Sequence, residues 1–213
     1  MIRLFLCALL TGAYLFASAI FHQAIAVPSK GYSRLNNVIT EAPAVLEYFS
    51  FYCPACYRYD HDFKVTGRVK DILPEGTKLT QYHASFMGPL GDELTRAWSI
   101  AILMGIEDKV KPLLFDAVQV KKSVHAWEDI RRVFISAGVP GTEFDAAWGS
   151  FAVISLTEKQ NVLASQLELV SIPSIYINGK YRINSDGMDM RSIDTFSEDY
   201  AGTVKYLLSK KQP

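Results

Sequence analysis

The feature that most constrains the fold is a pair of cysteines, Cys53 and Cys56, directly after an apolar run. The run, residues 45–52 (VLEYFSFY), is typical of a buried strand because it is short, continuous and rich in aromatic residues. Helical spacing follows the cysteines, and Pro54 suits a first helical position since it has no N–H to leave unpaired. The pattern predicts that the pair lies where a central strand ends and a helix begins.

That position predicts redox chemistry for the two thiols. Cys53 would face the free amides and the positive dipole end of the helix, which favour a thiolate over a thiol. Cys56, one turn further in, would be partly covered and could attack any disulfide that Cys53 forms. We therefore predict Cys53 and Cys56 as a catalytic, disulfide-forming pair.

The first 26 residues have the pattern of a secretory signal peptide. A basic start is followed by an apolar stretch, residues 4–21, and by the small-x-small pattern that ends at Ala26. We expect cleavage after Ala26; a retained membrane anchor is the alternative, disfavoured because the apolar stretch is short. Cleavage would remove Cys7 and leave only Cys53 and Cys56 in the mature chain.

Two alternatives to redox exchange concern the same cysteines. A zinc site needs about four ligands, and His83 and His125 stand alone in the sequence, so we expect no metal. A purely structural disulfide is disfavoured because so small a loop constrains the unfolded chain little. An exported chain with a strand-to-helix cysteine pair favours exchange.

Composition and charge fit one sizeable globular core with room for an inserted subdomain, in a chain of 213 residues that is 49% hydrophobic. The 22 basic residues balance the 22 acidic residues, and loss of Arg3 with the signal leaves 21 against 22, a net charge of −1. Such a chain has no long-range attraction to nucleic acid or anionic lipid. We expect no nucleic-acid partner.

The order of predicted elements indicates an α/β chain. Strand character falls in residues 32–39, 45–52, 78–83, 174–177 and 180–183, and Asn178-Gly179 between the last two predicts a hairpin. Helical spacing falls in residues 54–73, 94–105, 110–120, 129–137, 144–148, 151–169 and 190–208. We therefore expect a sheet domain, residues 27–86 and 161–213, interrupted by an all-helical insert, residues 87–160.

Pro173 precedes the hairpin strand, where a proline is often ordinary trans punctuation. We favour a cis Ile172–Pro173 bond, which would present the Ile172 N–H and C=O beside the cysteines. An extended peptide could pair there as an added strand. Proline also offers no sulfur or nitrogen that could bind a metal.

Glu47 is a carboxyl inside the apolar strand. One hypothesis is a partly buried group under the cysteine pair, with a raised pKa, that exchanges a proton with Cys56. The alternative is a carboxylate at a strand end with water or a basic partner nearby.

Beyond the cysteine motif, many stretches resemble the DsbA family of thioredoxin-fold thiol oxidases, namely residues 45–57, 82–83, 86–88, 105–110, 145–148, 172–173, 177–181, 187–189 and 200–207. The resemblance implies a thioredoxin-like fold with an inserted helical domain, and a soluble periplasmic protein. It implies donation of a disulfide to reduced, partly folded exported proteins and reoxidation by a DsbB-like membrane quinone reductase. We expect a monomer without a cofactor.

The same resemblance assigns roles to individual residues. Cys53 would be the nucleophile, Cys56 the resolving thiol and Pro173 the cis-proline. A groove for the substrate peptide or the reoxidising loop would be lined by Pro54, Ala55, Ile172, Pro173, Tyr59, Phe63, Met190 and Ile193.

Two positions depart from the family pattern. The dipeptide between the cysteines is Pro54-Ala55 where the family has Pro-His, and Gln81 stands where the family often has a lysine across from Glu47. Loss of the imidazole should raise the pKa of Cys53, and about one pKa unit is roughly 1.4 kcal/mol or 30 mV. We expect a less oxidising enzyme, in which Glu47 lacks its cation and stays protonated to higher pH.

Three other functions remain open from the sequence. A specialised oxidase would serve only a few substrates. A disulfide isomerase or reductase is the alternative enzyme, and an isomerase would usually need dimerisation, for which we find no spare amino-terminal domain. A chaperone-like peptide binder would use the groove and keep the cysteines only as vestiges.

Overall fold

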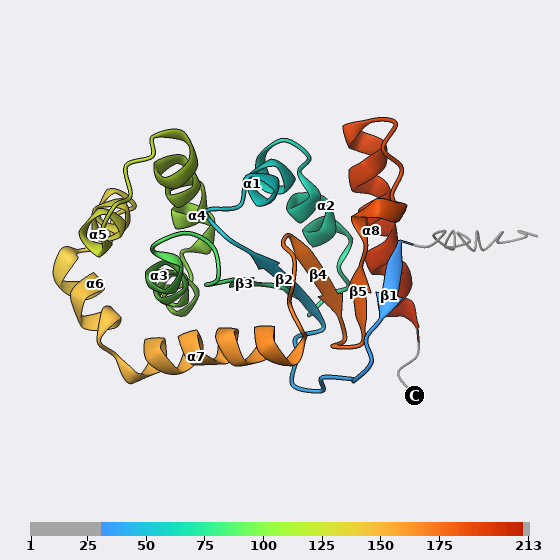
Figure 1. Ribbon diagram of the computed structural model, residues 1–213, viewed down its shortest axis with the longest axis horizontal. Helices are drawn as coiled ribbons and strands as arrows, with labels where there is room; N and C mark the ends of the chain where they lie inside the picture. Colours follow the sequence, from blue (N-terminus) through green and yellow to red (C-terminus); the bar gives the residue numbers. More distant parts are fainter. Residues whose placement is uncertain (1–30, 211–213) are drawn as a thin grey trace, which may run out of the picture.

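The computed structural model describes residues 31–210, and the predicted signal segment lies outside them. Within these residues five strands form one sheet in the order β1-β5-β4-β2-β3 (Figure 1). The strands are β1 (Tyr32–Arg34), β2 (Val45–Phe49), β3 (Leu79–His83), β4 (Ser174–Ile177) and β5 (Tyr181–Ile183). The α/β class expected from the sequence is confirmed.

Strand β2 lies inside the sheet, parallel to β3 and antiparallel to β4. All five of its residues are buried because helices cover both of its faces. Val45 packs with residues of α2 and α8, whereas Leu46 and Tyr48 pack with residues of α7. Burial on both faces explains why β2 lacks the alternation of a half-exposed strand.

Two helices, α1 (Pro54–His61) and α2 (Val65–Ile72), replace the single helix predicted over residues 54–73. Lys64 has φ 52°, a left-handed conformation that no helix can pass through. The break turns the chain so that Tyr59 of α1 and Val65 of α2 reach the same apolar cluster against α8. Apolar spacing alone concealed the break, because Phe63 also packs against that cluster.

Five helices and a π-helical turn follow one another between β3 and β4. They are α3 (Gly91–Met104), α4 (Glu107–Phe115), the π turn η1 (Asp116–Val120), α5 (Trp127–Ser136), α6 (Gly141–Trp148) and α7 (Phe151–Gln166). Gly105 ends α3 with φ 65°, as the sequence predicts. Helix α4 begins before the predicted residue 110, so Pro112 lies inside the helix and not in its first turn.

The Asn178-Gly179 hairpin is confirmed, with both residues at positive φ and Lys180 N–H donating to Ile177 O over 3.0 Å. A side chain at Gly179 would also collide with Ile39 O. The 3-10 turn η2 (Ser185–Gly187) leads to α8 (Ile193–Ser209). Helix α8 starts later than the predicted residue 190, because Ser192 Oγ caps it by accepting from Thr195 N–H at 3.1 Å.

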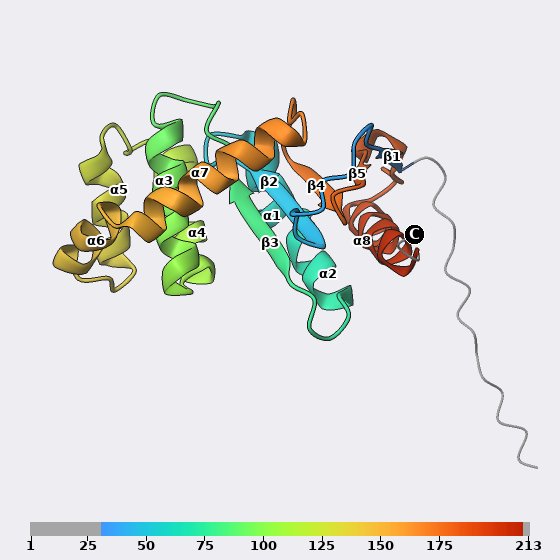
Figure 2. The same ribbon diagram turned by 90° about the horizontal axis from the view of Figure 1, so that it is seen from below.

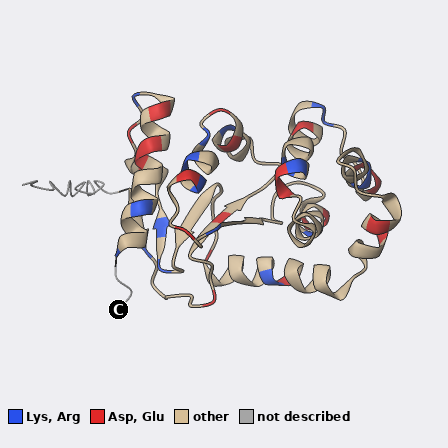
Figure 3. Ribbon diagram, turned by 180° about the vertical axis from the view of Figure 1, so that it is seen from behind, with Lys and Arg blue, Asp and Glu red and all other residues tan. Residues whose placement is uncertain are grey.

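Helices α3 to α6 gather at one end of the molecule, and α7 leads from them back to the sheet (Figure 2). Basic and acidic residues occur together on the helices, in agreement with the balanced charge of the chain (Figure 3). Among residues 31–210, no helix is both long enough and apolar enough to cross a membrane.

Candidate active site at the start of helix α1

Cys53 is the residue that caps the amino end of α1. Its backbone is extended, with φ −89° and ψ 110°, and Pro54 follows in the first turn. The Cys53 sulfur accepts a hydrogen bond from the Cys56 backbone N–H, with Sγ and N 3.1 Å apart. The predicted position between a buried strand and a helix is therefore confirmed.

The pKa of Cys53 is lowered to about 7. A hydrogen bond from the Cys56 thiol contributes most, and the backbone amides of Cys56 and Ala55 and the charge of Arg58 act in the same direction, whereas burial opposes them. About half of the Cys53 side chains would then be thiolate at pH 7. The cap position supplies an anion-stabilising environment without a histidine between the cysteines.

Cys56 has the opposite electrostatic environment. Its side chain is buried, and burial is the largest cause that raises its pKa above the ordinary range. The neighbouring Cys53 and the charge of Glu47 raise the pKa further. Both thiols are free in this structure, which therefore has the dithiol form of the pair.

The peptide bond between Ile172 and Pro173 is cis, as predicted. Ile172 O lies 3.7 Å from the Cys53 sulfur, within reach of a thiol hydrogen bond. Ser174, at the start of β4, donates from Oγ to Ser171 O at 2.7 Å and holds this loop beside the strand. The structure thus brings together the cysteine pair and the proline loop, which are far apart in the sequence.

Glu47 is more deeply buried than the sequence suggested, with 3% of its surface exposed. Its Oε2 accepts from Gln81 Nε2 at 2.6 Å and from Thr66 Oγ1 at 3.5 Å. Burial is the main cause that raises the pKa of Glu47. Burial in the middle of β2 supports the first hypothesis, and of the alternative only the nearby basic partner remains.

His83, which stands alone in the sequence, lies at the site in the structure. It is fully buried, and burial lowers its pKa to about 3, so the ring is neutral. Its Nε2 accepts from Phe51 N–H at 3.1 Å, and its Nδ1 lies 2.8 Å from Thr95 Oγ1. Gln119 of η1 also holds Phe51, because its Nε2 donates to Phe51 O at 2.8 Å. These bonds fix the loop that carries Cys53.

Lys111 of α4 is a second residue that the sequence did not indicate. Its Nζ lies 2.9 Å from Asp60 Oδ1 of α1, and its positive charge lowers the pKa of Glu47 against the effect of burial. Within residues 31–210 no cation pairs directly with Glu47 and its pKa is raised, both as expected, but the charge of Lys111 offsets part of the rise. Helical spacing cannot show which strand residue a lysine on another element will face.

The predicted groove residues differ in accessibility. Met190 and Ile193 are 68% and 50% exposed, and Phe63 is partly buried. Pro54 is exposed, whereas Ala55, Ile172 and Pro173 are partly buried beside the cysteines.

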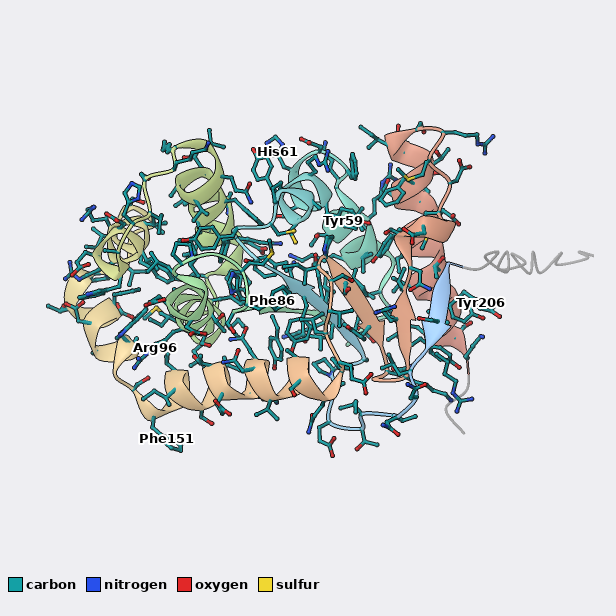
Figure 4. All side chains as sticks on the ribbon, viewed as in Figure 1. Tyr59, His61, Phe86, Arg96, Phe151 and Tyr206 are labelled. Atoms are coloured by element: carbon teal, nitrogen blue, oxygen red, sulfur yellow. The ribbon has the colours of Figure 1, made fainter. Side chains whose placement is uncertain are left out.

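The assignment of Tyr59 to the groove lining is corrected. Its side chain is buried and packs edge-on against Phe196 and Tyr200 of α8, because the turn at Lys64 folds α1 and α2 onto that helix. Figure 4 shows Tyr59 on the inner side of α1, whereas His61 points outward.

In the part of the chain that the structure describes, no three His, Cys, Asp or Glu residues lie close enough to hold a metal ion.

Comparisons of the sequence and of the structure with known proteins both find DsbA proteins. Residues 44–201 match the model of the DSBA-like thioredoxin domain family. The thiol:disulfide interchange protein DsbA of Salmonella typhimurium is 51% identical over 182 residues, which cover 85% of this chain and 88% of that protein. The corresponding protein of Escherichia coli O6:H1 is 48% identical over 183 residues, covering 85% of this chain and 88% of that protein.

Two solved structures are similar along most of their length. A complex of a cysteine-to-serine variant of Proteus mirabilis DsbA with a non-covalently bound peptide, PWATCDS, has a TM-score of 0.84 and 40% identity, and covers 86% of this chain and 98% of that chain. The SrgA structure from Salmonella enterica serovar Typhimurium has a TM-score of 0.81 and 37% identity, and covers 84% of this chain and 99% of that chain.

Proposed function

Because this chain belongs to the DSBA-like thioredoxin domain family and is a disulfide oxidoreductase, we propose that it oxidises dithiols in newly exported proteins. The thioredoxin-like fold with its inserted helices, expected from the sequence, agrees with the solved relatives. We propose residues 27–86 and 161–213 as the thioredoxin-like domain and residues 87–160 as the helical domain.

The proposed reaction moves two electrons from a substrate dithiol to the Cys53–Cys56 disulfide. A substrate thiolate attacks the Cys53 sulfur, the bond to Cys56 breaks, and Cys56 leaves with the electron pair and takes up a proton. The second substrate thiolate then attacks the substrate sulfur of the mixed disulfide, and Cys53 leaves as a thiolate. The substrate keeps the new disulfide and the enzyme keeps the two thiols.

The observation that carries this proposal is the contrast between the two sulfurs. A lowered pKa makes Cys53 a good leaving group in the second step, so the disulfide is readily given to the substrate. The raised pKa of Cys56 keeps that thiol protonated, so it does not attack the mixed disulfide at Cys53 until a neighbouring base takes its proton. Glu47, buried on the same side of β2 as α1 and α2, is our candidate for the group that exchanges this proton.

The substrate site that we propose is the surface around the cis-proline loop. Ile172 O lies 3.7 Å from the Cys53 sulfur, and the backbone there could pair with an extended peptide. The peptide that is bound non-covalently to the Proteus mirabilis relative supports a peptide as the ligand. The proposed lining consists of Pro54, Ala55, Phe63, Ile172, Pro173, Met190 and Ile193.

The cell compartment and the partners are also part of the proposal. The pattern of residues 1–26 supports export with cleavage after Ala26, and we propose a monomer of the periplasm that needs no cofactor. A DsbB-like membrane quinone reductase would restore the disulfide by accepting the two electrons.

Complementation of a DsbA-deficient bacterium, with and without its DsbB, tests the whole proposal. We expect restored disulfide formation only when DsbB is present, and no restoration by the Cys53→Ala variant. Refolding of reduced ribonuclease by the purified protein separates the other functions. A peptide binder would keep its effect in Cys53→Ala, and an isomerase would act on scrambled ribonuclease better than on reduced ribonuclease; either result would overturn the oxidase proposal.

A further inference from the structure

Lys111 is a buried lysine of α4, one of the helices between β3 and β4, and its side chain reaches helix α1 of the candidate active site. Only 6% of its surface is exposed, although lysine is seldom buried unless it is paired. Its partner is Asp60 Oδ1, 2.9 Å from Nζ, and the ammonium group also lies 4.7 Å from the centre of the Phe49 ring. A lysine held in this way carries a positive charge that solvent screens poorly.

The Lys111–Asp60 ion pair lines the same cavity as the residues that surround Glu47. A cavity of about 510 Å³ is lined by Lys111 and Asp60 and also by Gln81 and Thr66. Gln81 and Thr66 are the two residues that donate hydrogen bonds to Glu47 Oε2. The Lys111–Asp60 pair and the two hydrogen-bond donors to Glu47 therefore line the same cavity.

The groups in contact with Glu47 are neutral, so its charge state depends on ions further away. Gln81 offers an amide and Thr66 a hydroxyl, and β4 places Ile175 opposite Glu47. The titratable and charged groups that act on Glu47 or are affected by it are Cys56, Tyr59 and Asp60 of α1, Lys70 of α2, Lys111 of α4 and Tyr200 of α8.

The two members of the ion pair act on Glu47 in opposite directions. After burial, the charge of Lys111 is the largest influence on the pKa of Glu47 and lowers it, and the charge of Asp60 comes next and raises it. Lys70 acts more weakly, and it is half exposed and paired with Asp108 at 3.0 Å. Lys111 is thus the main cation that favours the ionised form of Glu47.

We propose that Lys111, paired with Asp60, is a positioning residue that sets the charge state of Glu47 and so controls when the Cys56 thiol can lose its proton. Lys111 itself touches neither sulfur nor substrate and acts through Glu47. The inference rests on the proposed function, because it takes Cys56 as the resolving thiol. Proton exchange at the cysteine pair then depends on a side chain that the helical segment supplies.

The titration of Glu47 can be followed directly by the carbon-13 resonance of its carboxyl group, assigned with Glu47→Gln. In Lys111→Met the cation is lost and Asp60 faces Glu47 unpaired, so the midpoint should rise by about one pH unit. In Asp60→Asn the anion is lost and Lys111 acts unopposed, so the midpoint should fall. Lys121→Met is the matched control, because Lys121 also pairs with an aspartate, Asp116, but is exposed.

The reaction of Cys56 supplies the second measurement. Cys53 is joined to glutathione, and the rate at which Cys56 releases glutathione is recorded against pH. The midpoint of this profile should move up in Lys111→Met and down in Asp60→Asn. In the reduced protein without glutathione, the thiolate absorbance of Cys53 should keep its own midpoint in both variants. Lys111 is not among the groups that shift the pKa of Cys53.

Opposite shifts in the two variants support the inference, and a purely structural role for the ion pair would not produce them. Unchanged midpoints, or shifts in the same direction, would overturn it. If Lys111→Met does not fold, the direction of the shift in Asp60→Asn still decides. The Glu47 titration needs no substrate, so it can fail while the oxidase proposal stands, or succeed in a protein that oxidises nothing.

Discussion

The two sides of the first turn of α1 place the same functional group in opposite environments. On the outer side, the Cys53 sulfur caps the helix, accepts from the Cys56 amide and lies beside Ile172 O. On the inner side, Cys56 has Glu47 nearby, and burial dominates its titration although its side chain is no more buried than that of Cys53. The pKa is lowered for the first thiol and raised for the second.

The difference shows that two cysteines only three positions apart in the sequence can have opposite acidities. Three residues of helix are enough to move a sulfur from the free amides of the helix end to a site where those amides are already bonded. One sulfur is therefore suited to carry a negative charge and the other to hold a proton. An exchange reaction that proceeds through two sulfurs in sequence needs both properties.

The largest expected effect comes from removing either thiol. Cys53→Ala should lose oxidation of reduced ribonuclease by a factor on the order of a thousand or more, because no other group can form the mixed disulfide. Cys56→Ala should instead accumulate mixed disulfides with substrate, visible on non-reducing gels. The contrast between the two sulfurs fails if Cys56→Ala and Cys53→Ala behave alike.

Removal of the buried carboxyl should come next in size. Glu47→Gln keeps a hydrogen-bonding group toward Gln81 but cannot exchange a proton, so release of glutathione by Cys56 should slow roughly a hundredfold near neutral pH. Rapid-mixing fluorescence would give the rate. Glu143→Gln, an exposed carboxyl on α6, is the control, and equal rates in both variants would make Glu47 a bystander.

A positive charge between the cysteines should lower the pKa of Cys53, on the outer side, and leave the inner side unchanged. In Ala55→His the imidazolium would favour the Cys53 thiolate, and a fall of about one unit in its pKa makes the disulfide about 30 mV more oxidising. A redox titration against glutathione measures the change, with Ala55→Gln as the uncharged control. A histidine variant no more oxidising than the control would contradict the account of Cys53.

The smallest effect concerns stability on the inner side. Because the folded protein raises the pKa of Glu47 above 4.5, this residue stabilises the fold most at low pH, and that contribution is lost as pH rises through the folded pKa. Glu47→Gln does not titrate, so its unfolding free energy should gain on the parent as pH rises, by about 1.4 kcal/mol per unit of pKa difference. Urea unfolding of the disulfide form at pH 4 and pH 8 gives the comparison, and a pH-independent difference would contradict it.

Much of the sheet and of the outer side could be predicted because the signals are local. The buried run before Cys53, the proline after it and the Asn178-Gly179 turn each specify backbone conformation within a few residues. The position of Glu47 in the same run also placed it under the helix. These features need no knowledge of distant contacts.

The inner side could not be predicted as well, because it depends on contacts between distant elements. Lys111 and Asp60 are 51 positions apart, and His83 holds Phe51 across 32 positions. The end of α1 was also missed, since Phe63 continued the apolar spacing while Lys64 took a left-handed conformation that is unusual outside glycine and asparagine. The buried Tyr59 follows from that turn.

The pH dependence of thiolate formation at Cys53 tests the central claim most directly. Ultraviolet absorbance of the reduced protein, with Cys53→Ala as the baseline, isolates this one thiol. We expect a single transition near pH 7 for Cys53 and none for Cys56 over the range in which the protein stays folded. A Cys53 midpoint near 8.5, the value of a free cysteine, would contradict the account.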